Sequence, residues 1–114
     1  MVNLKQGDII KLDFDPQTGH EQKGRRPAIV LSTSYFNRYS KTILVCPITN
    51  TDKNHPFHVR LNNDTNTSGV ILCDQVKTLD IVAREYEYVE KAPKAIVLEA
   101  IDVISNFIEV EDLP

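Results

Sequence analysis

Two apolar stretches decide the fold: Pro27-Ala28-Ile29-Val30-Leu31 and Thr42-Ile43-Leu44-Val45-Cys46-Pro47-Ile48-Thr49. The first is a short continuous apolar run, which is typical of a strand covered on both sides, and the second predicts the next strand. Because proline cannot donate to a sheet ladder, Pro47 predicts an edge or a bulge there. The polar residues 32–39 between the two runs predict a turn or one short helix.

Further short strands are predicted on both sides of this pair. Residues 8–14 show partial alternation of branched and aromatic residues, and residues 57–61 alternate cleanly. Residues 69–73 and 75–79 predict two more strands, and residues 81–89 predict a final strand pair. Short strands separated by turn signals favour a small barrel or sandwich.

The C-terminal part of the chain changes to a helical period. Pro93 suits the first turn of a helix, and apolar residues recur at three- and four-residue steps from Ile96 to Ile108. Leu98 and Val103 widen this stripe beyond one face. The excess favours a helix that covers its own barrel and also meets a second copy of the chain, with a core helix in a monomer as the alternative.

Length and composition predict one globular domain over residues 1–114, because 41% of the residues are hydrophobic and 25% are charged. Cys46 and Cys73 lie in apolar runs without C-x-x-C spacing, which favours reduced core residues of a cytoplasmic protein over a structural disulfide. No apolar stretch approaches the roughly 18 residues that span a bilayer, so no membrane partner is expected.

Charge is unevenly distributed along the chain. The net charge of −3 argues, taken whole, against a polyanionic partner. However, residues 1–60 carry a net +4 and all three histidines, whereas residues 61–114 carry a net −7. Because local potential steers a charged ligand, the first sixty residues predict a surface that attracts a polyanion; ordinary solvated faces are the alternative.

Familiar nucleotide and hydrolase motifs are absent from the sequence. It contains no G-x-x-x-x-G-K-[ST], no G-x-G-x-x-G and no G-x-S-x-G, which excludes a P-loop, a Rossmann turn and a hydrolase elbow. His55 and His58 flank Pro56 at a strand start, and the cysteines are isolated. We therefore predict no metal site and no cofactor.

Two arginines stand at the start of a predicted strand, directly after a glycine-bounded segment. The stretch reads Gly19-His20-Glu21-Gln22-Lys23-Gly24-Arg25-Arg26-Pro27. An arginine fork matches the geometry of a phosphate, and a strand anchors it better than a loop would. Thr49 could supply the hydroxyl that a phosphoryl site also needs. The alternatives are a surface ion pair of Arg26 with Asp13 or Asp15, and an ordinary strand end at Thr49.

Several ordered motifs resemble the MazF/PemK family of toxin endoribonucleases. They begin with Gly7-Asp8-Ile9-Ile10, Asp13-Phe14-Asp15-Pro16 and the segment from Gly19 to Ser32. They continue with Cys46-Pro47-Ile48-Thr49, Pro56-Phe57, Ser68-Gly69-Val70, Asp74-Gln75-Val76-Lys77-Thr78-Leu79-Asp80 and the terminal helix. Together they cover most of the chain in the family's order.

The resemblance implies a mainly β fold with a C-terminal helix (α+β), a small SH3-like β-barrel of the CcdB/PemK type that works as a homodimer. It also implies a metal-independent endoribonuclease that cuts single-stranded mRNA and is neutralised by a MazE-like antitoxin. Two other classes stay open: a CcdB-like toxin that inhibits a topoisomerase without catalysis, and an RNA-binding SH3-like module.

Site residues carried over from the family are Arg26 and Thr49 as catalytic residues, with Glu21 at a position tied to activity in some members. We expect a ribose 2′-hydroxyl to attack the adjacent phosphorus, leaving a 2′,3′-cyclic phosphate and a 5′-hydroxyl. Arginine cannot readily lose a proton, so Glu21 or His20 is the better candidate for proton transfer. The expected RNA-binding residues are His20, Lys23, Arg25, Lys53, His55, Arg60, Gln75 and Lys77.

Overall fold

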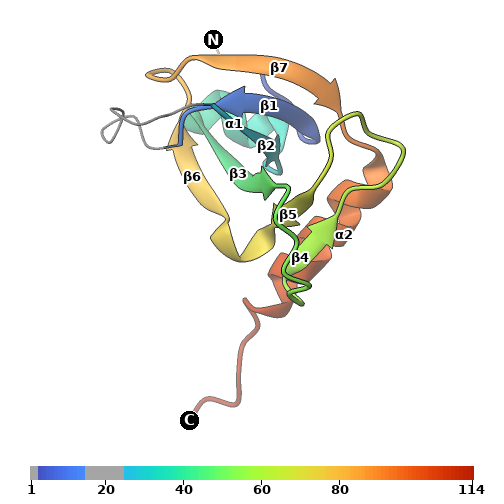
Figure 1. The fold of residues 1–114 in the computed structure, drawn as a ribbon. Coiled ribbons are helices and arrows are strands. Elements are labelled where there is room, and N and C mark those ends of the chain that lie inside the picture. The colour runs from blue at the N-terminus through green and yellow to red at the C-terminus, as the bar shows by residue number, and fades with distance from the viewer. Residues whose placement is uncertain (1–2, 15–24) are drawn as a thin grey trace.

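The computed structural model describes residues 3–14 and 25–114, so the predicted loop at 15–24 lies outside the described residues. Within these ranges the chain forms seven strands, two α-helices and one 3₁₀ turn (Figure 1). The elements are β1 (Asp8–Leu12), β2 (Arg26–Val30), α1 (Ser34–Ser40), β3 (Thr42–Thr49), β4 (His58–Arg60), β5 (Val70–Leu72), η2 (Cys73–Gln75), β6 (Lys77–Asp80), β7 (Tyr86–Lys91) and α2 (Lys94–Asn106).

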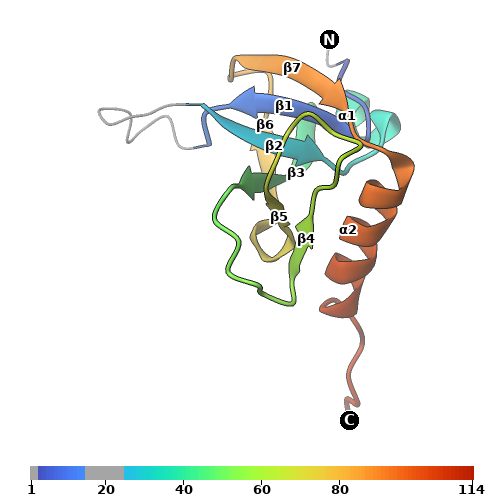
Figure 2. The same cartoon turned by 45° about the vertical axis from the view of Figure 1, so that its right-hand side comes forward.

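The strands form one antiparallel sheet in the order β4-β5-β3-β2-β1-β7, and β6 also pairs with β3. The predicted mainly β architecture with a C-terminal helix is confirmed. The sheet bends strongly, but among the described strands β4 and β7 do not pair with each other (Figure 2). The expected barrel is therefore open rather than closed.

Strand β3 is central, and Pro47 marks the point where one of its edges changes partner. That edge pairs with β6 from Thr42 to Val45 and with β5 from Ile48 to Thr49. On the opposite edge, Pro47 lies across from Ala28 of β2. A proline is tolerated inside this strand because it falls in the interval between two ladders.

The predicted strand pair at 81–89 is wrong, because only one strand, β7, forms there. The Asp80 carboxylate accepts hydrogen bonds from the backbone amides of Val82 (3.0 Å) and Ala83 (3.4 Å). Such a turn ends β6, and the chain then continues to the edge of the sheet next to β1. There β7 pairs with β1, a long-range partner that local alternation cannot reveal.

Two apolar clusters occupy the two faces of the sheet, because successive residues of a strand point to opposite sides. The first contains Ile9, Ile29, Cys46, Ile48 and Ile71, together with Ile96, Val97 and Ala100 of α2. The second contains Ile10, Leu12, Ala28, Val30, Ile43, Val45 and Leu79. Helix α2 therefore covers only the first face.

The two cysteines belong to the first cluster and are buried free thiols. A hydrogen bond with Cys73 and burial raise the pKa of the Cys46 thiol.

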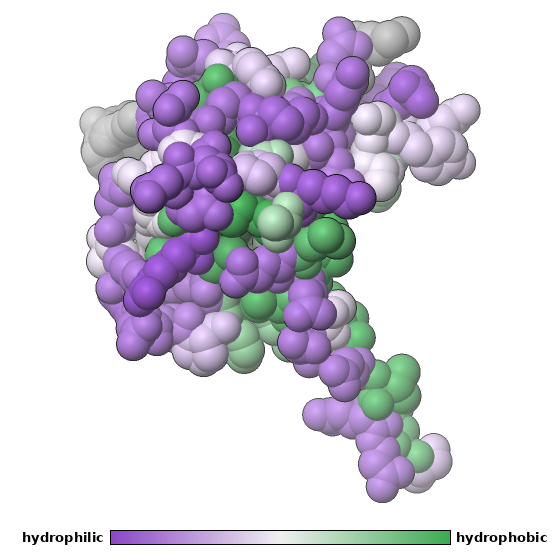
Figure 3. Space-filling model, turned by 90° about the vertical axis from the view of Figure 1, so that its right-hand side faces the viewer, coloured by the Kyte–Doolittle hydropathy of each residue, from purple (hydrophilic) through white to green (hydrophobic). Residues whose placement is uncertain are grey.

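Helix α2 keeps a wide apolar surface in solvent. Leu98 and Ile101 are exposed on it, and the exposed Phe107 and Ile108 follow its end. Figure 3 shows hydrophobic residues on this side of the molecule and along the C-terminal segment. The predicted contact with a second copy of the chain stays a prediction. No helix of the described part is long and apolar enough to cross a membrane.

Candidate active site

The structure places Arg26 and Thr49 at the same end of the sheet. Arg26 is the first residue of β2, and Thr49 is the last residue of β3. The ladder pairs Ala28 with Pro47, and the same register continued by two residues sets Arg26 across from Thr49. Cross-strand neighbours point to the same face, so the two predicted catalytic side chains share one surface.

That surface is the rim of the second apolar cluster. Along β2 and β3 the residues Ala28, Val30, Val45 and Ile43 fill this cluster, and Arg26 and Thr49 continue the same alternation outward. Arg26 is exposed, and within the described ranges no carboxylate forms an ion pair with it. Among the described residues, its guanidinium therefore has no carboxylate partner and faces solvent.

Lys77 joins this rim from β6. It pairs with Val45 of β3 and so shares the face of Thr49. Its ammonium lies 5.3 Å from the centre of the Phe14 ring, and Phe14 packs on the second cluster. We call the surface formed by the predicted catalytic residues Arg26 and Thr49 and the predicted RNA-binding residue Lys77 the catalytic rim; it presents two cations and one hydroxyl.

The hydroxyl of Thr49 has one hydrogen-bond partner close by in its own chain. Its oxygen accepts the backbone N–H of Thr51 at 3.2 Å, so the hydroxyl proton remains available for another acceptor. On the other side of Thr49, Gly69 packs so closely that a β-carbon there would lie 2.3 Å from the Thr49 carbonyl oxygen. Gly69 also has a φ of +117°, which L side chains rarely adopt.

Arg25 occupies a different environment from Arg26. Its guanidinium reaches Glu85 at 3.3 Å and Glu87 at 4.0 Å, and Glu87 belongs to β7. Neighbouring residues of an extended chain point to opposite faces, which separates Arg25 from the catalytic rim. The contact of Arg25 with RNA stays a prediction, and such a contact would lie on the face of the sheet opposite the catalytic rim.

Three more predicted RNA-binding residues lie in the segment after β3 and at the end of β4. Arg60 bonds Asp52 at 2.6 Å and the Asn54 side chain at 3.1 Å. A backbone hydrogen bond from Asn54 and the Arg60 guanidinium lower the pKa of Asp52. Lys53 is exposed, and the His55 ring accepts the backbone N–H of Phe57 at its Nδ1 (3.1 Å).

One group of described residues has metal-ligand chemistry: the possible donor atoms of His55, His58 and Asp74 lie within 4.8 Å of one another. The hydrogen bonds there do not suit a metal. His58 Nε2 lies 3.3 Å from Asp74, and a metal at this nitrogen would leave a proton on Nδ1, a buried atom without a hydrogen-bond partner among the described residues. His55 Nδ1 is engaged by Phe57. The absence of a metal site stays a prediction.

Four other predicted residues remain to be placed. His20, Glu21 and Lys23 lie outside the described residues, so the candidate groups for proton transfer are not located. Gln75 is exposed at the end of η2, two residues before Lys77.

Two contributors to the site, Phe14 and Gly69, lie in motifs that carry the family resemblance, but the sequence predicts no site role for either. Their roles depend on contacts between distant segments, Phe14 beneath Lys77 and Gly69 against Thr49. The alternation of a strand, by contrast, could have separated Arg25 from Arg26.

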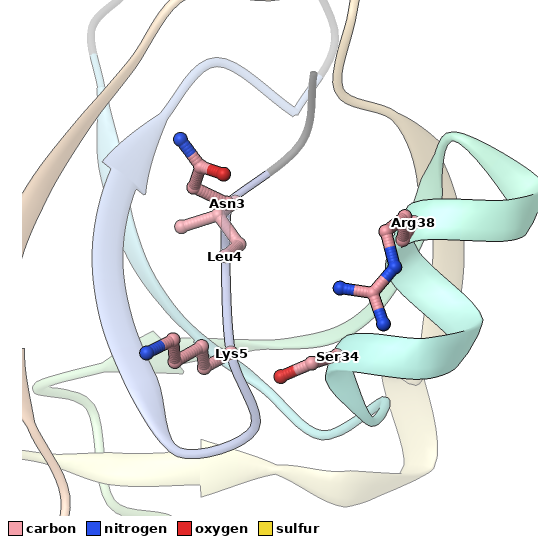
Figure 4. A pocket seen from close by; sticks show the side chains of 5 residues that line it. All are labelled: Asn3, Leu4, Lys5, Ser34 and Arg38. Atoms are coloured by element: carbon pink, nitrogen blue, oxygen red, sulfur yellow. The ribbon is translucent and has the colours of Figure 1, made fainter.

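A shallow pocket of about 340 Å³ lies elsewhere, beside the start of β1 and α1 (Figure 4). Its lining residues are Asn3, Leu4, Lys5, Ser34 and Arg38. Because β1 ends beside Arg26 and the pocket precedes its start, the pocket and the catalytic rim lie at opposite ends of the sheet.

Comparison with known proteins identifies the family of the chain. Residues 5–108 match the family model described as PemK-like, MazF-like toxin of type II toxin-antitoxin system. The chain belongs to the PemK/MazF toxin family.

Among PemK/MazF relatives, endoribonuclease PemK of Escherichia coli is 33% identical over 110 residues, covering 93% of this chain and 83% of PemK. Endoribonuclease toxin MazF of Escherichia coli strain K12 is 45% identical over 78 residues, covering 68% of this chain and 69% of MazF. A chain from the MazE-MazF (Form-III) crystal structure of Deinococcus radiodurans superposes with a TM-score of 0.84 at 33% identity, covering 94% and 97% of the two chains.

Proposed function

We propose that this protein is a toxin endoribonuclease of a type II toxin–antitoxin system that cleaves single-stranded mRNA. Family membership and relatives that are named endoribonucleases support this function. The observation that carries it is the catalytic rim, where an arginine without a described carboxylate partner and a threonine hydroxyl face the same side at adjacent strand ends.

The proposed reaction is an internal transfer at phosphorus. The ribose 2′-oxygen bonds to phosphorus, the bond from phosphorus to the 5′-oxygen breaks, and a 2′,3′-cyclic phosphate and a 5′-hydroxyl result. The 2′-hydroxyl gives its proton to a base, and the leaving oxygen receives one from an acid. Glu21 or His20 is our candidate for these transfers, because Arg26 stays protonated.

Arg26 and Thr49 act on the charge that develops in this reaction. Negative charge builds on the phosphoryl oxygens as the 2′-oxygen approaches, and the Arg26 fork stabilises it more in the transition state than in the ground state. Thr49 donates its free hydroxyl proton to the same oxygens while accepting from Thr51. No step requires a metal, and the need for a 2′-hydroxyl selects RNA over DNA.

The RNA strand follows the positive surface of the first sixty residues. Lys77 lies on the same face of the sheet as Thr49 and holds a neighbouring phosphate as a point charge. Lys53 and His55 contact the strand from the segment after Thr49, and Gln75 contacts it from η2. Such contacts to the backbone position the strand without specifying its sequence.

A MazE-like antitoxin would block this surface in a cytoplasmic complex. MazE-MazF crystal structures from Deinococcus radiodurans resemble this chain and support such a partner. An acidic segment that orders on binding would pair with the cations that otherwise hold phosphates.

The toxin would act as a homodimer through the exposed apolar residues of α2. Light scattering should then give about twice 12.9 kDa.

The test is cleavage of mixed mRNA by the wild-type protein, Arg26→Ala and Thr49→Val, with Arg38→Ala as a matched control at the far end of the sheet. We expect cleavage by the wild type and the control, and little by the two rim variants. Intact RNA with the folded wild type would contradict the proposal and favour a non-catalytic binder.

A bound antitoxin should also compete with RNA. Unchanged RNA affinity in the presence of antitoxin would mean that the antitoxin inhibits the protein at another surface.

A further inference from the structure

Glu90 of β7 is linked to Thr49 through a chain of specific contacts, although the two residues lie on strands that do not pair. The Glu90 carboxylate accepts hydrogen bonds from Asn66 N (3.1 Å), Thr67 N (2.7 Å) and the Thr67 hydroxyl (2.7 Å). The Thr67 hydroxyl and the Asn66 amide lower the pKa of Glu90, so it is ionised at neutral pH. One carboxylate thus holds the segment between β4 and β5.

A bulge in β7 brings Glu90 to this position. The register pairs Ile9 with Glu90 but Ile10 with Tyr88, so Val89 is an extra residue opposite β1. Bulges of this kind turn a side chain away from its regular direction and often lie next to active sites. Here the side chain reaches the segment 62–68, which otherwise consists largely of exposed polar residues.

The held segment leads directly to Thr49. Gly69 follows it and packs against the Thr49 carbonyl, where a β-carbon would lie 2.3 Å away. Val70 pairs with Thr49 in the ladder, and the Ser68 hydroxyl donates to the side-chain oxygen of Asn50 at 2.9 Å. Segment 66–70 therefore forms the wall behind the backbone of Thr49.

We infer that Glu90 is a positioning residue for the reaction: its carboxylate fixes segment 66–70, and that segment sets the direction of the Thr49 hydroxyl. This inference rests on the proposed function. Glu90 touches no reacting atom, so it affects the transition state through Thr49. A displacement of the hydroxyl by a fraction of an ångström weakens a bond made to the developing charge.

The experiment compares the wild type with Glu90→Gln and Thr67→Val, and with Glu111→Gln as a control that removes the same charge from the exposed C-terminal tail. The substrate is an oligonucleotide that carries a cleavage site first mapped on a transcript. We expect kcat to fall about tenfold in Glu90→Gln and less in Thr67→Val, with KM within twofold of the wild type. The Glu111→Gln control should match the wild type in both constants.

Hydrogen exchange supplies a readout that does not depend on cleavage. Amide exchange in residues 66–70 and at Thr51, whose N–H bonds the Thr49 oxygen, should accelerate in Glu90→Gln, whereas exchange in β1 and β2 should not change. Unchanged kcat and unchanged exchange in Glu90→Gln would overturn the inference, and so would an equal loss in Glu111→Gln. If the wild type cleaves no RNA, the proposed function fails, while exchange still tests the contact.

Discussion

The two ends of the sheet differ in whether their polar side chains are bonded within the protein. At the α1 end, Asn37 is fully buried and its amide donates to the carbonyl oxygens of Leu4 (2.8 Å) and Ser32 (3.4 Å). Its side-chain oxygen accepts the Ser32 hydroxyl, which in turn accepts the amide of Leu44 (2.9 Å). At the catalytic rim, by contrast, Arg26 is exposed without a described carboxylate, and Thr49 keeps a free hydroxyl proton.

This difference separates architecture from function. Every hydrogen bond described for the Asn37 side chain has its partner within the protein. These bonds join the N-terminal segment, α1 and β3, and so stabilise the fold. Among the described residues, Arg26 and Thr49 keep bonding capacity that a ligand with phosphate oxygens can use. Changes at the first end should therefore alter stability, and changes at the second should alter catalysis.

The largest expected effect follows from Arg26→Ala. Loss of one donor to the developing charge should lower kcat by about 10²–10³-fold, while the melting temperature stays near the wild-type value because the side chain is exposed. Arg25→Ala is the matched control, since this neighbour faces Glu85 and Glu87. Single-turnover cleavage measures both. An equal loss in the two variants would remove the distinction between the two faces.

Asn37→Ala should produce the reverse pattern. It leaves the carbonyl of Leu4 without the donor from Asn37 and the hydroxyl proton of Ser32 without its acceptor, which should lower the free energy of unfolding by about 3 kcal/mol. Urea denaturation measures this loss, and kcat of the folded variant should match the wild type. A large fall in kcat with unchanged stability would contradict the division between the two ends.

Much of this arrangement could be predicted from the sequence, because it depends on local periodicity. The runs at 27–31 and 42–49 and the helical stripe after Pro93 each report which side of an element is buried. Arg26 and Thr49 could be chosen because Arg26 precedes one of these runs and Thr49 ends the other, within motifs that resemble a known family.

The rest depends on contacts between distant segments. The pairing of β7 with β1 and the bond from Thr67 to Glu90 join residues that are far apart in the chain. The burial of Asn37 depends on Leu4, which is 33 residues away. No local pattern reports such partners, which explains why 81–89 was wrongly expected to form a strand pair.

Lys77→Met should weaken RNA binding without changing the reaction. The loss of one phosphate contact should reduce the slope of log K against log salt by about 0.7, with kcat at saturating RNA unchanged. Lys5→Met, at the opposite end of the sheet, is the control and should leave the slope unchanged. Fluorescence anisotropy with labelled single-stranded RNA measures both slopes. Equal slopes in Lys77→Met and the wild type would remove Lys77 from the interface.

The smallest effect concerns pH. The pKa of Glu90 is lowered in the folded protein, so its stabilisation is present above the pKa of the unfolded chain and is lost as pH falls through the folded value. The wild type should exceed Glu90→Gln in stability by no more than about 1 kcal/mol at pH 7, and this difference should disappear as pH falls through the lowered pKa of the Glu90 carboxyl. Denaturation at several pH values checks this. A difference that grows on acidification would contradict the assigned hydrogen bonds.

The most direct test of the account is the chemistry of the RNA ends. A transcript is incubated with the purified wild-type protein in excess EDTA, and the fragment termini are identified by mass spectrometry. The account predicts cleavage at a rate unaffected by the chelator, with a 2′,3′-cyclic phosphate on one fragment and a 5′-hydroxyl on the next. Cleavage that stops in EDTA and returns with magnesium, or fragments that carry a 5′-phosphate, would contradict it.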